Sequence, residues 1–163
     1  MVVWQSPQGS RRIAALLVML GLFVTNNAEA SYEERCHEAR EHLLKEDYDA
    51  AVKAYGEAIE ANADVATAYV GRALAYLAKG EHDKAIEDCR LAIRRDEEHA
   101  LAHVVCGSAL FAQGKLDEAK THYDRALDID PEHSGARAGR AAIFHKRAVN
   151  HQQQEDYERA LND

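Results

Sequence analysis

From residue 32 onward, small and apolar residues recur three or four positions apart, which places them on one face of a helix. Short polar segments, two of which contain Gly80 and Gly114, separate these stretches. Glycine permits the positive φ at which many helices end, so both glycines are expected to close a helix. The pattern predicts helices over about 33–45, 48–61, 67–79, 82–95, 101–113, 116–129 and 135–152.

The pattern also repeats at a longer interval of 34 residues. Blocks that begin at residues 32, 66, 100 and 134 carry the same kinds of residue at the same internal positions. A helix pair of this length cannot bury its apolar face alone, so successive copies are expected to stack into a solenoid. Small residues occupy positions 8, 20 and 27 of the blocks, where helices would pack closely: Ala39, Ala73, Gly107, Ala141, Ala51, Ala85, Ala119, Ala58, Ala92 and Ala126.

With Tyr55, Cys89 and Tyr123 at position 24 of these blocks, the chain after residue 31 resembles the tetratricopeptide repeat family. The resemblance implies an all-α fold, a right-handed superhelical solenoid of stacked antiparallel helix pairs. The repeats would cover about 32–65, 66–99, 100–133 and 134–163, the last extended and incomplete. It also implies an adaptor that binds other proteins and carries no catalysis.

The fourth block departs from the repeat. Its turn-like motif, Glu155–Leu161, arrives seven residues later than the spacing predicts. Either 136–161 forms one long capping helix, or the sequence is a truncated piece of a longer array. The absence of Gly or Pro after Gly139 permits the first alternative, and the copied Glu-Asp-Tyr motif favours the second.

The first 30 residues have the composition of a secretory signal peptide. Arg11 and Arg12 precede an apolar run over Ile13–Val24, and Ala28-Glu29-Ala30 has the small-x-small spacing of a cleavage site. Cleavage after Ala30 would leave a mature domain over 31–163, whereas an uncleaved anchor is the alternative. We expect an exported protein, in a bacterial periplasm first, with the endoplasmic reticulum lumen or secretion as the alternative.

The net charge and the spacing of the histidines argue against several kinds of partner and site. The formal net charge of −8 argues against nucleic acid as a partner and against an anionic membrane as a partner of the mature form. His37 and His42 lie five residues apart, so they do not share a helix face as paired zinc ligands would. His99 and His103 have the required spacing but no evident third ligand. We therefore predict no metal, no cofactor and no catalytic residues.

The three cysteines matter in an exported chain, because disulfides form in such compartments. Cys89 and Cys106 would face each other across a repeat junction, so either a disulfide or two buried thiols could result. Cys36 falls on the groove side of the first helix, where it would be free or available for a link between molecules.

Family members generally bind ligands in a concave groove, with positions 2, 5, 9 and 12 of the first helix of each repeat facing the ligand. In the second and third repeats these positions are mainly apolar: Thr67, Val70, Leu74, Leu77, Leu101, Val104, Ser108 and Phe111. We expect this groove to bind an apolar peptide or helix of another protein. The alternative is a self-assembling structural protein that uses the same stripe between subunits.

The resemblance also permits a test for one class of partner. Co-chaperone members hold a chaperone's C-terminal carboxylate with Lys, Asn and Arg side chains. The corresponding positions here hold Cys36, Arg40, Gly71, Leu101 and Val105. The expected donors are largely absent, so the sequence predicts no carboxylate-clamp chaperone binding.

Overall fold

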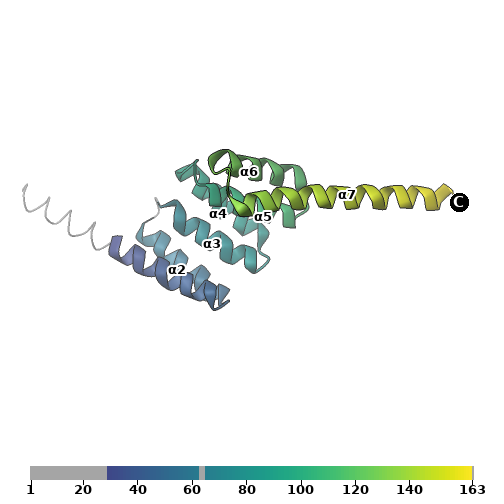
Figure 1. The fold of residues 1–163 in the computed structure, drawn as a ribbon. Helices are drawn as coiled ribbons and strands as arrows, with labels where there is room; N and C mark the ends of the chain where they lie inside the picture. The colour runs from purple at the N-terminus through teal and green to yellow at the C-terminus, as the bar shows by residue number, and fades with distance from the viewer. Residues whose placement is uncertain (1–28, 63–64, 163) are drawn as a thin grey trace, which may run out of the picture.

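A computed structural model describes residues 29–62 and 65–162, with side chains through residue 155. Every regular element in this part is a helix: an N-terminal helix over 29–44, α2 (Tyr48–Ala61), α3 (Ala66–Ala78), α4 (His82–Arg95), α5 (Ala100–Ala112), α6 (Leu116–Ile129) and α7 (Ser134–Asn162). Each of α2–α7 packs against the next in the chain, and α3, α5 and α7 also meet in succession (Figure 1). The predicted all-α solenoid is confirmed. The predicted signal peptide lies almost wholly outside the described residues.

Alanine lets neighbouring helices approach closely. Eight alanines at positions 8, 20 and 27 have no exposed surface: Ala39, Ala51, Ala58, Ala73, Ala85, Ala92, Ala119 and Ala126. Without side-chain atoms beyond Cβ, they permit interaxial distances of about 8–10 Å. Ala141, the equivalent residue of α7, is exposed, since no helix in the described part of the chain covers that face.

The turns follow the expected chemistry. Gly80 and Gly114 both have φ of +78°, as the helix-end prediction requires. Glu46 occupies the same position in the first repeat and adopts φ of 59° despite its side chain. After α4 and α6, the carboxylates of Asp96 and Asp130 accept backbone N–H bonds from the residues two positions later, each at 3.1 Å.

Polar side chains cap three helices. The Asp47 carboxylate accepts the Ala50 N–H at the start of α2. The Nδ1 atoms of His99 and His133 accept backbone N–H bonds at the starts of α5 and α7, each at 3.3 Å. Two of the nine histidines are therefore explained as caps of equivalent helices one repeat apart.

The final helix is longer than its counterparts. The apolar pattern predicts an end near residue 152, but α7 continues unbroken from Ser134 to Asn162 and extends beyond the stacked pairs (Figure 1). The one-helix alternative for the fourth block thus describes this structure. Lacking Gly and Pro after Gly139, the segment contains no residue that forces a break.

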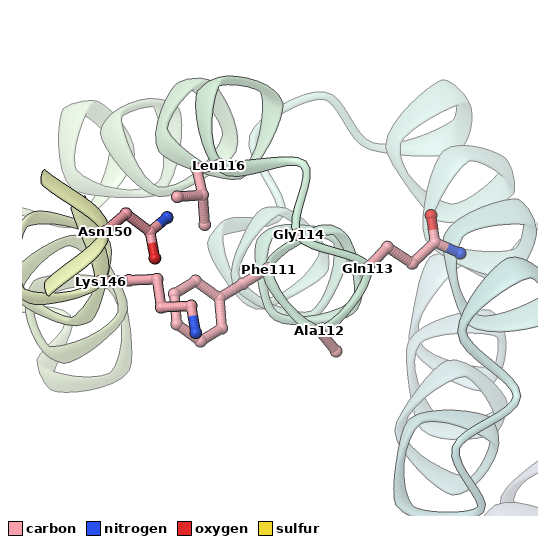
Figure 2. Close-up of a pocket in the computed structure, with 7 residues that line it drawn as sticks. All are labelled: Phe111, Ala112, Gln113, Gly114, Leu116, Lys146 and Asn150. Atoms are coloured by element: carbon pink, nitrogen blue, oxygen red, sulfur yellow. The ribbon is translucent and has the colours of Figure 1, made fainter. Parts of the chain in front are cut away.

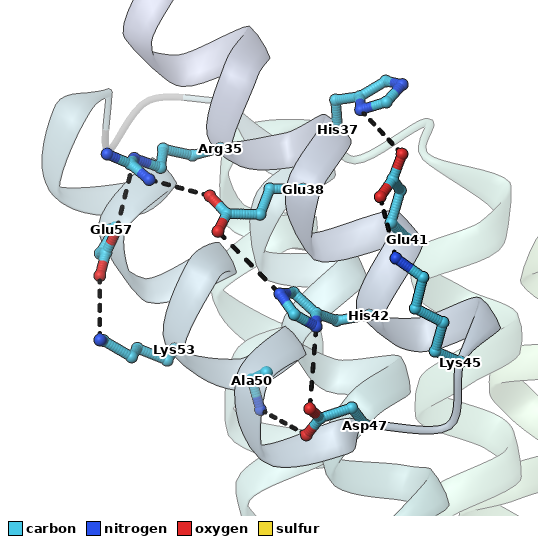
Figure 3. A network of polar contacts seen from close by, with 10 residues as sticks. All are labelled: Arg35, His37, Glu38, Glu41, His42, Lys45, Asp47, Ala50, Lys53 and Glu57. Atoms are coloured by element: carbon cyan, nitrogen blue, oxygen red, sulfur yellow. Dashed lines mark hydrogen bonds and ion pairs between the residues drawn. The ribbon is translucent and has the colours of Figure 1, made fainter.

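Surface ion pairs connect the N-terminal helix to α2 (Figure 3). Arg35 bridges Glu38 of its own helix and Glu57 of α2, at 2.8 and 3.3 Å. His42 lies near Glu38 and Asp47, whereas His37 lies near Glu41. The two histidines therefore face different carboxylates, and solvent screening leaves exposed pairs of this kind with little effect on stability.

Candidate functional site

The eight predicted groove residues differ in how much surface they expose. Val70 and Val104 are buried, at 2% and 9% exposure, because neighbouring helices close over position 5. Thr67 and Leu101 are exposed, and Leu74, Leu77, Ser108 and Phe111 are half-buried. Four apolar side chains on α3 and α5 thus remain accessible: Leu74, Leu77, Leu101 and Phe111. Their role in binding stays a prediction.

Ser108 takes part in a local hydrogen-bond network. Its hydroxyl donates to the Val104 carbonyl at 3.0 Å and lies 3.0 Å from the Tyr123 hydroxyl. Because the Ser108 hydrogen is already used, the Tyr123 hydroxyl is the donor of the second bond. The hydrogen bond from Tyr123 of α6 therefore fixes the position of the Ser108 side chain on the groove surface.

A pocket of about 460 Å³ lies beside the last turn of α5, between the start of α6 and the middle of α7. Figure 2 shows Phe111 and Leu116 on its apolar side, with Lys146 and Asn150 reaching in from α7. Gln113 and Ala112 point away from these groups in the same view. Phe111 thus joins the predicted groove to a pocket that also contains an ammonium group and an amide.

The positions expected to hold clamp donors have other roles in the packing. A Cβ atom on Gly71 would stand 2.3 Å from the Tyr55 ring, so the ring occupies the space of any side chain there. Val105 is 2% exposed. The Arg40 guanidinium donates from Nε to the Cys36 carbonyl at 3.2 Å.

All three cysteines are buried free thiols. Cys36 is only 3% exposed and packs with Ala39, Tyr55 and Ala68, so the expectation that it faces the groove is wrong. Cys89 and Cys106 lie in the same buried cluster at the junction between α4 and α5, close enough for each thiol to shift the pKa of the other. The sequence had placed them face to face, and the structure shows them as two thiols.

Two histidines whose proximity the sequence pattern did not predict lie beside these two cysteines. The Cys106 sulfur lies 3.4 Å from Nε2 of His122, on α6. Nδ1 of His122 lies 3.2 Å from Nδ1 of His103, whose Nε2 is 3.3 Å from the Glu97 carbonyl. We define Cys89, Cys106, His122 and His103 as the thiol–imidazole cluster.

Hydrogen-bond donors in the cluster can be assigned from its ends. A carbonyl only accepts, so His103 carries its hydrogen on Nε2 and its Nδ1 accepts when the ring is neutral. Nδ1 of His122 must then be the donor, which leaves Nε2 of His122 to face the Cys106 sulfur. Burial lowers the pKa of His103 and so favours this neutral ring.

These surroundings shift the pKa values of the two thiols in opposite directions. The neighbouring Cys89 thiol, together with the His122 imidazole that can take up the Cys106 proton, lowers the pKa of Cys106 below that of an ordinary thiol. The pKa of Cys89 is raised by its bond to Cys106 and by burial. Cys106 is therefore the thiol that ionises first, and Cys89 keeps its proton.

Within the described residues, no group of three or more His, Cys, Asp or Glu side chains has an arrangement suited to a metal ion. None of the helices in that part of the chain combines the length and apolarity needed to cross a bilayer.

Two family models, both described as tetratricopeptide repeat, match residues 36–100 and 98–162. Together they cover both halves of the solenoid, and the second match includes the whole of the late motif Glu155–Leu161. A comparison with curated proteins gives no match.

Solved structures extend the similarity. The TPR2B domain of yeast Sti1, in a complex with pHsp70, is 30% identical with a TM-score of 0.67, covering 74% of this chain and 98% of that one. The second TPR domain of human RPAP3, in complex with the HSP70 peptide SGPTIEEVD, is 27% identical with a TM-score of 0.66 and the same coverage. The first TPR of Spaghetti (RPAP3), bound to the HSP90 peptide SRMEEVD, is 26% identical with a TM-score of 0.70, covering 73% and 94%.

These complexes correct one prediction. The sequence predicts no carboxylate-clamp chaperone binding, but similar domains are bound to HSP70 and HSP90 peptides, which contradicts that prediction. The prediction rested on five positions in one register of the repeat. Polar groups outside those positions, such as Lys146 and Asn150 on the extended α7, line the pocket beside Phe111.

Proposed function

Because this chain belongs to the tetratricopeptide repeat family, we propose that it is an adaptor that binds a peptide segment of a partner protein. The family consists typically of non-enzymatic interaction modules. The observation that carries the proposal is the row of accessible apolar side chains on α3 and α5: Leu74, Leu77, Leu101 and Phe111. Apolar side chains on adjacent rigid helices form a surface that becomes more favourable when a ligand removes water from it.

The pocket beside Phe111 refines the ligand chemistry. Phe111 and Leu116 can contact an apolar side chain, while the Lys146 ammonium can pair with a carboxylate beside it. We propose a ligand with apolar side chains next to an acidic group. The peptides SRMEEVD and SGPTIEEVD, held by two similar domains, contain both kinds of residue. Acidic peptides of this type are therefore among the ligands to be tested.

We also propose that the protein acts after export. The support is the sequence alone: the Arg11-Arg12 pair, the apolar run over Ile13–Val24 and the Ala28-Glu29-Ala30 end. Expression of the full chain in a secretion-competent host, followed by N-terminal sequencing, tests this. A mature protein beginning at Ser31 supports export with cleavage, and a chain retaining Met1 in the cytosol contradicts it.

Peptide binding can be measured directly by fluorescence anisotropy. The probes would be labelled SRMEEVD, labelled SGPTIEEVD and an amphipathic helix with leucines three and four residues apart and one acidic residue. We expect at least one probe to bind with a micromolar Kd, as is reasonable for a few buried side chains. Replacing Leu74 and Phe111 together by Glu should weaken that binding about tenfold or more, because the stripe would become acidic.

The matched control is Leu44→Glu. Leu44 is 86% exposed and lies at the end of the N-terminal helix, outside the stripe. This variant should bind like the wild type, and circular dichroism should show all variants folded. If no probe binds and the stripe variant instead abolishes a concentration-dependent dimer in sedimentation, the self-assembling alternative replaces the adaptor.

A further inference from the structure

We infer that the thiol–imidazole cluster is an oxidisable dithiol site, in which Cys106 reacts with a small peroxide and Cys89 then closes a disulfide. The inference is independent of what the groove binds. It rests on the contacts of His122 with Cys106 and His103, and on the position of Cys89 beside Cys106 in the buried cluster that α4, α5 and α6 share.

The position of Cys89 in the repeat shows how the site arises. The equivalent residues are Tyr55 and Tyr123, whose rings pack against glycines of the following helix. At Cys89 a small side chain replaces the ring, and the following helix supplies a second thiol from Cys106. The junction between the second and third repeats therefore places two thiols side by side where the other two junctions have tyrosine against glycine.

The histidines supply the proton chemistry. His122 presents Nε2 to Cys106 at 3.4 Å and can accept the thiol proton. His103 is a positioning residue, because its contact at 3.2 Å fixes which nitrogen of His122 is free to do so. His103 is itself fixed by the Glu97 carbonyl. This order of nucleophile, base and orienting group activates a thiol at neutral pH.

The oxidation balances in two steps. Cys106 transfers its proton to His122, and the thiolate attacks one oxygen of the peroxide ROOH. The O–O bond breaks, an S–O bond forms, and the leaving RO⁻ takes the proton from His122 to give ROH. The Cys89 sulfur then attacks the sulfenic sulfur, forming the S–S bond and expelling hydroxide, which leaves with the Cys89 proton as water. Overall, two thiols and one peroxide give a disulfide, an alcohol (or water) and water.

Burial restricts the oxidant. Cys89 and Cys106 have no exposed surface, whereas His122 is half-buried. Only a small molecule that enters as the junction opens can reach the sulfurs, so hydrogen peroxide fits and a protein oxidant does not. The product would tie α4 to α5, the helix that also carries Leu101 and Phe111.

The test treats the reduced full chain with hydrogen peroxide. The peroxide concentrations are kept in the range where the rate of thiol oxidation is proportional to peroxide concentration. Intact mass should show the loss of two hydrogens, and peptide mapping should show a Cys89–Cys106 bridge. Cys36→Ser is the matched control and should give the same bridge. Cys89→Ser should stop at the sulfenic acid, which dimedone labels at Cys106. A folded chain that forms no bridge, or one that bridges through Cys36, overturns the inference.

The role of His122 has its own readout. His122→Asn should slow oxidation about tenfold or more at pH 7, since the base is lost. The charged and titratable groups acting on Cys106 are Cys89 and Arg90 from α4 and His122 from α6. The wild-type rate should fall as pH drops through the ionisation of Cys106, and the variant should show this fall at higher pH. A variant with the same rate and the same pH midpoint as the wild type would show that His122 is not the base. If the variant does not fold, the pH profile of the wild type alone still tests whether the Cys106 thiol ionises at lower pH than an ordinary thiol.

Discussion

The ring of Tyr123 on α6 occupies the space in which Gly139 of α7 would place a side chain. A Cβ atom built on Gly139 would stand 2.2 Å from Cζ of the ring, far inside contact distance. Gly107 of α5 faces the same ring, with its Cβ position 3.0 Å from Cε1. Tyr123 therefore packs between two glycines, and α7 can approach α6 only because residue 139 lacks a side chain.

Replacing Gly139 with Ala should force Tyr123 or α7 to move and destabilise the fold by about 1–3 kcal/mol, as overpacking does. Urea unfolding followed by circular dichroism measures this. Gly56→Ala is the control, because its Cβ would meet Arg72 at an ordinary 3.8 Å. Alanine should there stabilise α2 by about 0.5–1 kcal/mol. Equal losses from both changes would contradict this account of Gly139.

Glu46→Gly should stabilise the protein by about 0.5–1 kcal/mol. Glu46 holds φ of 59°, a conformation that side chains disfavour and that its counterparts Gly80 and Gly114 adopt without strain. The reverse change, Gly80→Ala, should cost about 1 kcal/mol through the backbone alone, since no atom lies within 4 Å of its Cβ position. Thermal melts of both variants measure these two changes in stability. A lower Tm for Glu46→Gly than for the wild type would contradict the predicted strain at Glu46.

Ala85→Leu should destabilise by about 1–3 kcal/mol, because Ala85 has no exposed surface and lies within the core shared by α3–α7. Ala78→Leu, at an exposed position near the end of α3, serves as the control and should change stability by less than about 0.5 kcal/mol. Chemical denaturation gives both values. An unchanged midpoint for Ala85→Leu would show that position 20 of the repeat is not tightly packed.

Acidification should destabilise the fold through His103. Burial lowers its pKa, so the unfolded chain takes up a proton near the ordinary value of about 6.5 that the folded chain takes up only at lower pH. Stability therefore falls as pH decreases below that value. The groups that face His103 are His122, Arg125, His99 and the Glu97 carbonyl.

Melting temperatures from pH 7.5 to pH 5.5 would measure this dependence. His103→Gln removes the titrating ring and should give a smaller fall in Tm over the same range. A variant whose Tm falls as steeply as that of the wild type would assign the effect to other groups.

Helices α2–α6 were predicted to within one residue at each end, because their signals are local. Buried alanines mark the packed faces, and Gly80 and Gly114 mark two of the ends. The length of α7 has no such signal. Its sequence supports a helix throughout, and the late Glu155 motif does not itself interrupt one.

The site was less predictable, because it depends on distances between helices. Val70 and Val104 occupy groove positions in the repeat register, yet neighbouring helices bury both. His122 was missed because its partner His103 lies on another helix, 19 residues away. The preceding repeat contains a sequence signal for this site. Asp88 occupies the position equivalent to His122, and it is buried against Arg72 of the facing helix.

The order of contacts along the array also bears on how the protein folds. From α2 onward, each helix meets its neighbour in the chain or the helix after that. Contacts between residues close in sequence cost little loop-closure entropy, and chains dominated by them fold in microseconds to milliseconds. Each newly added helix pair can therefore pack against the pair before it, so the solenoid can assemble in order along the chain.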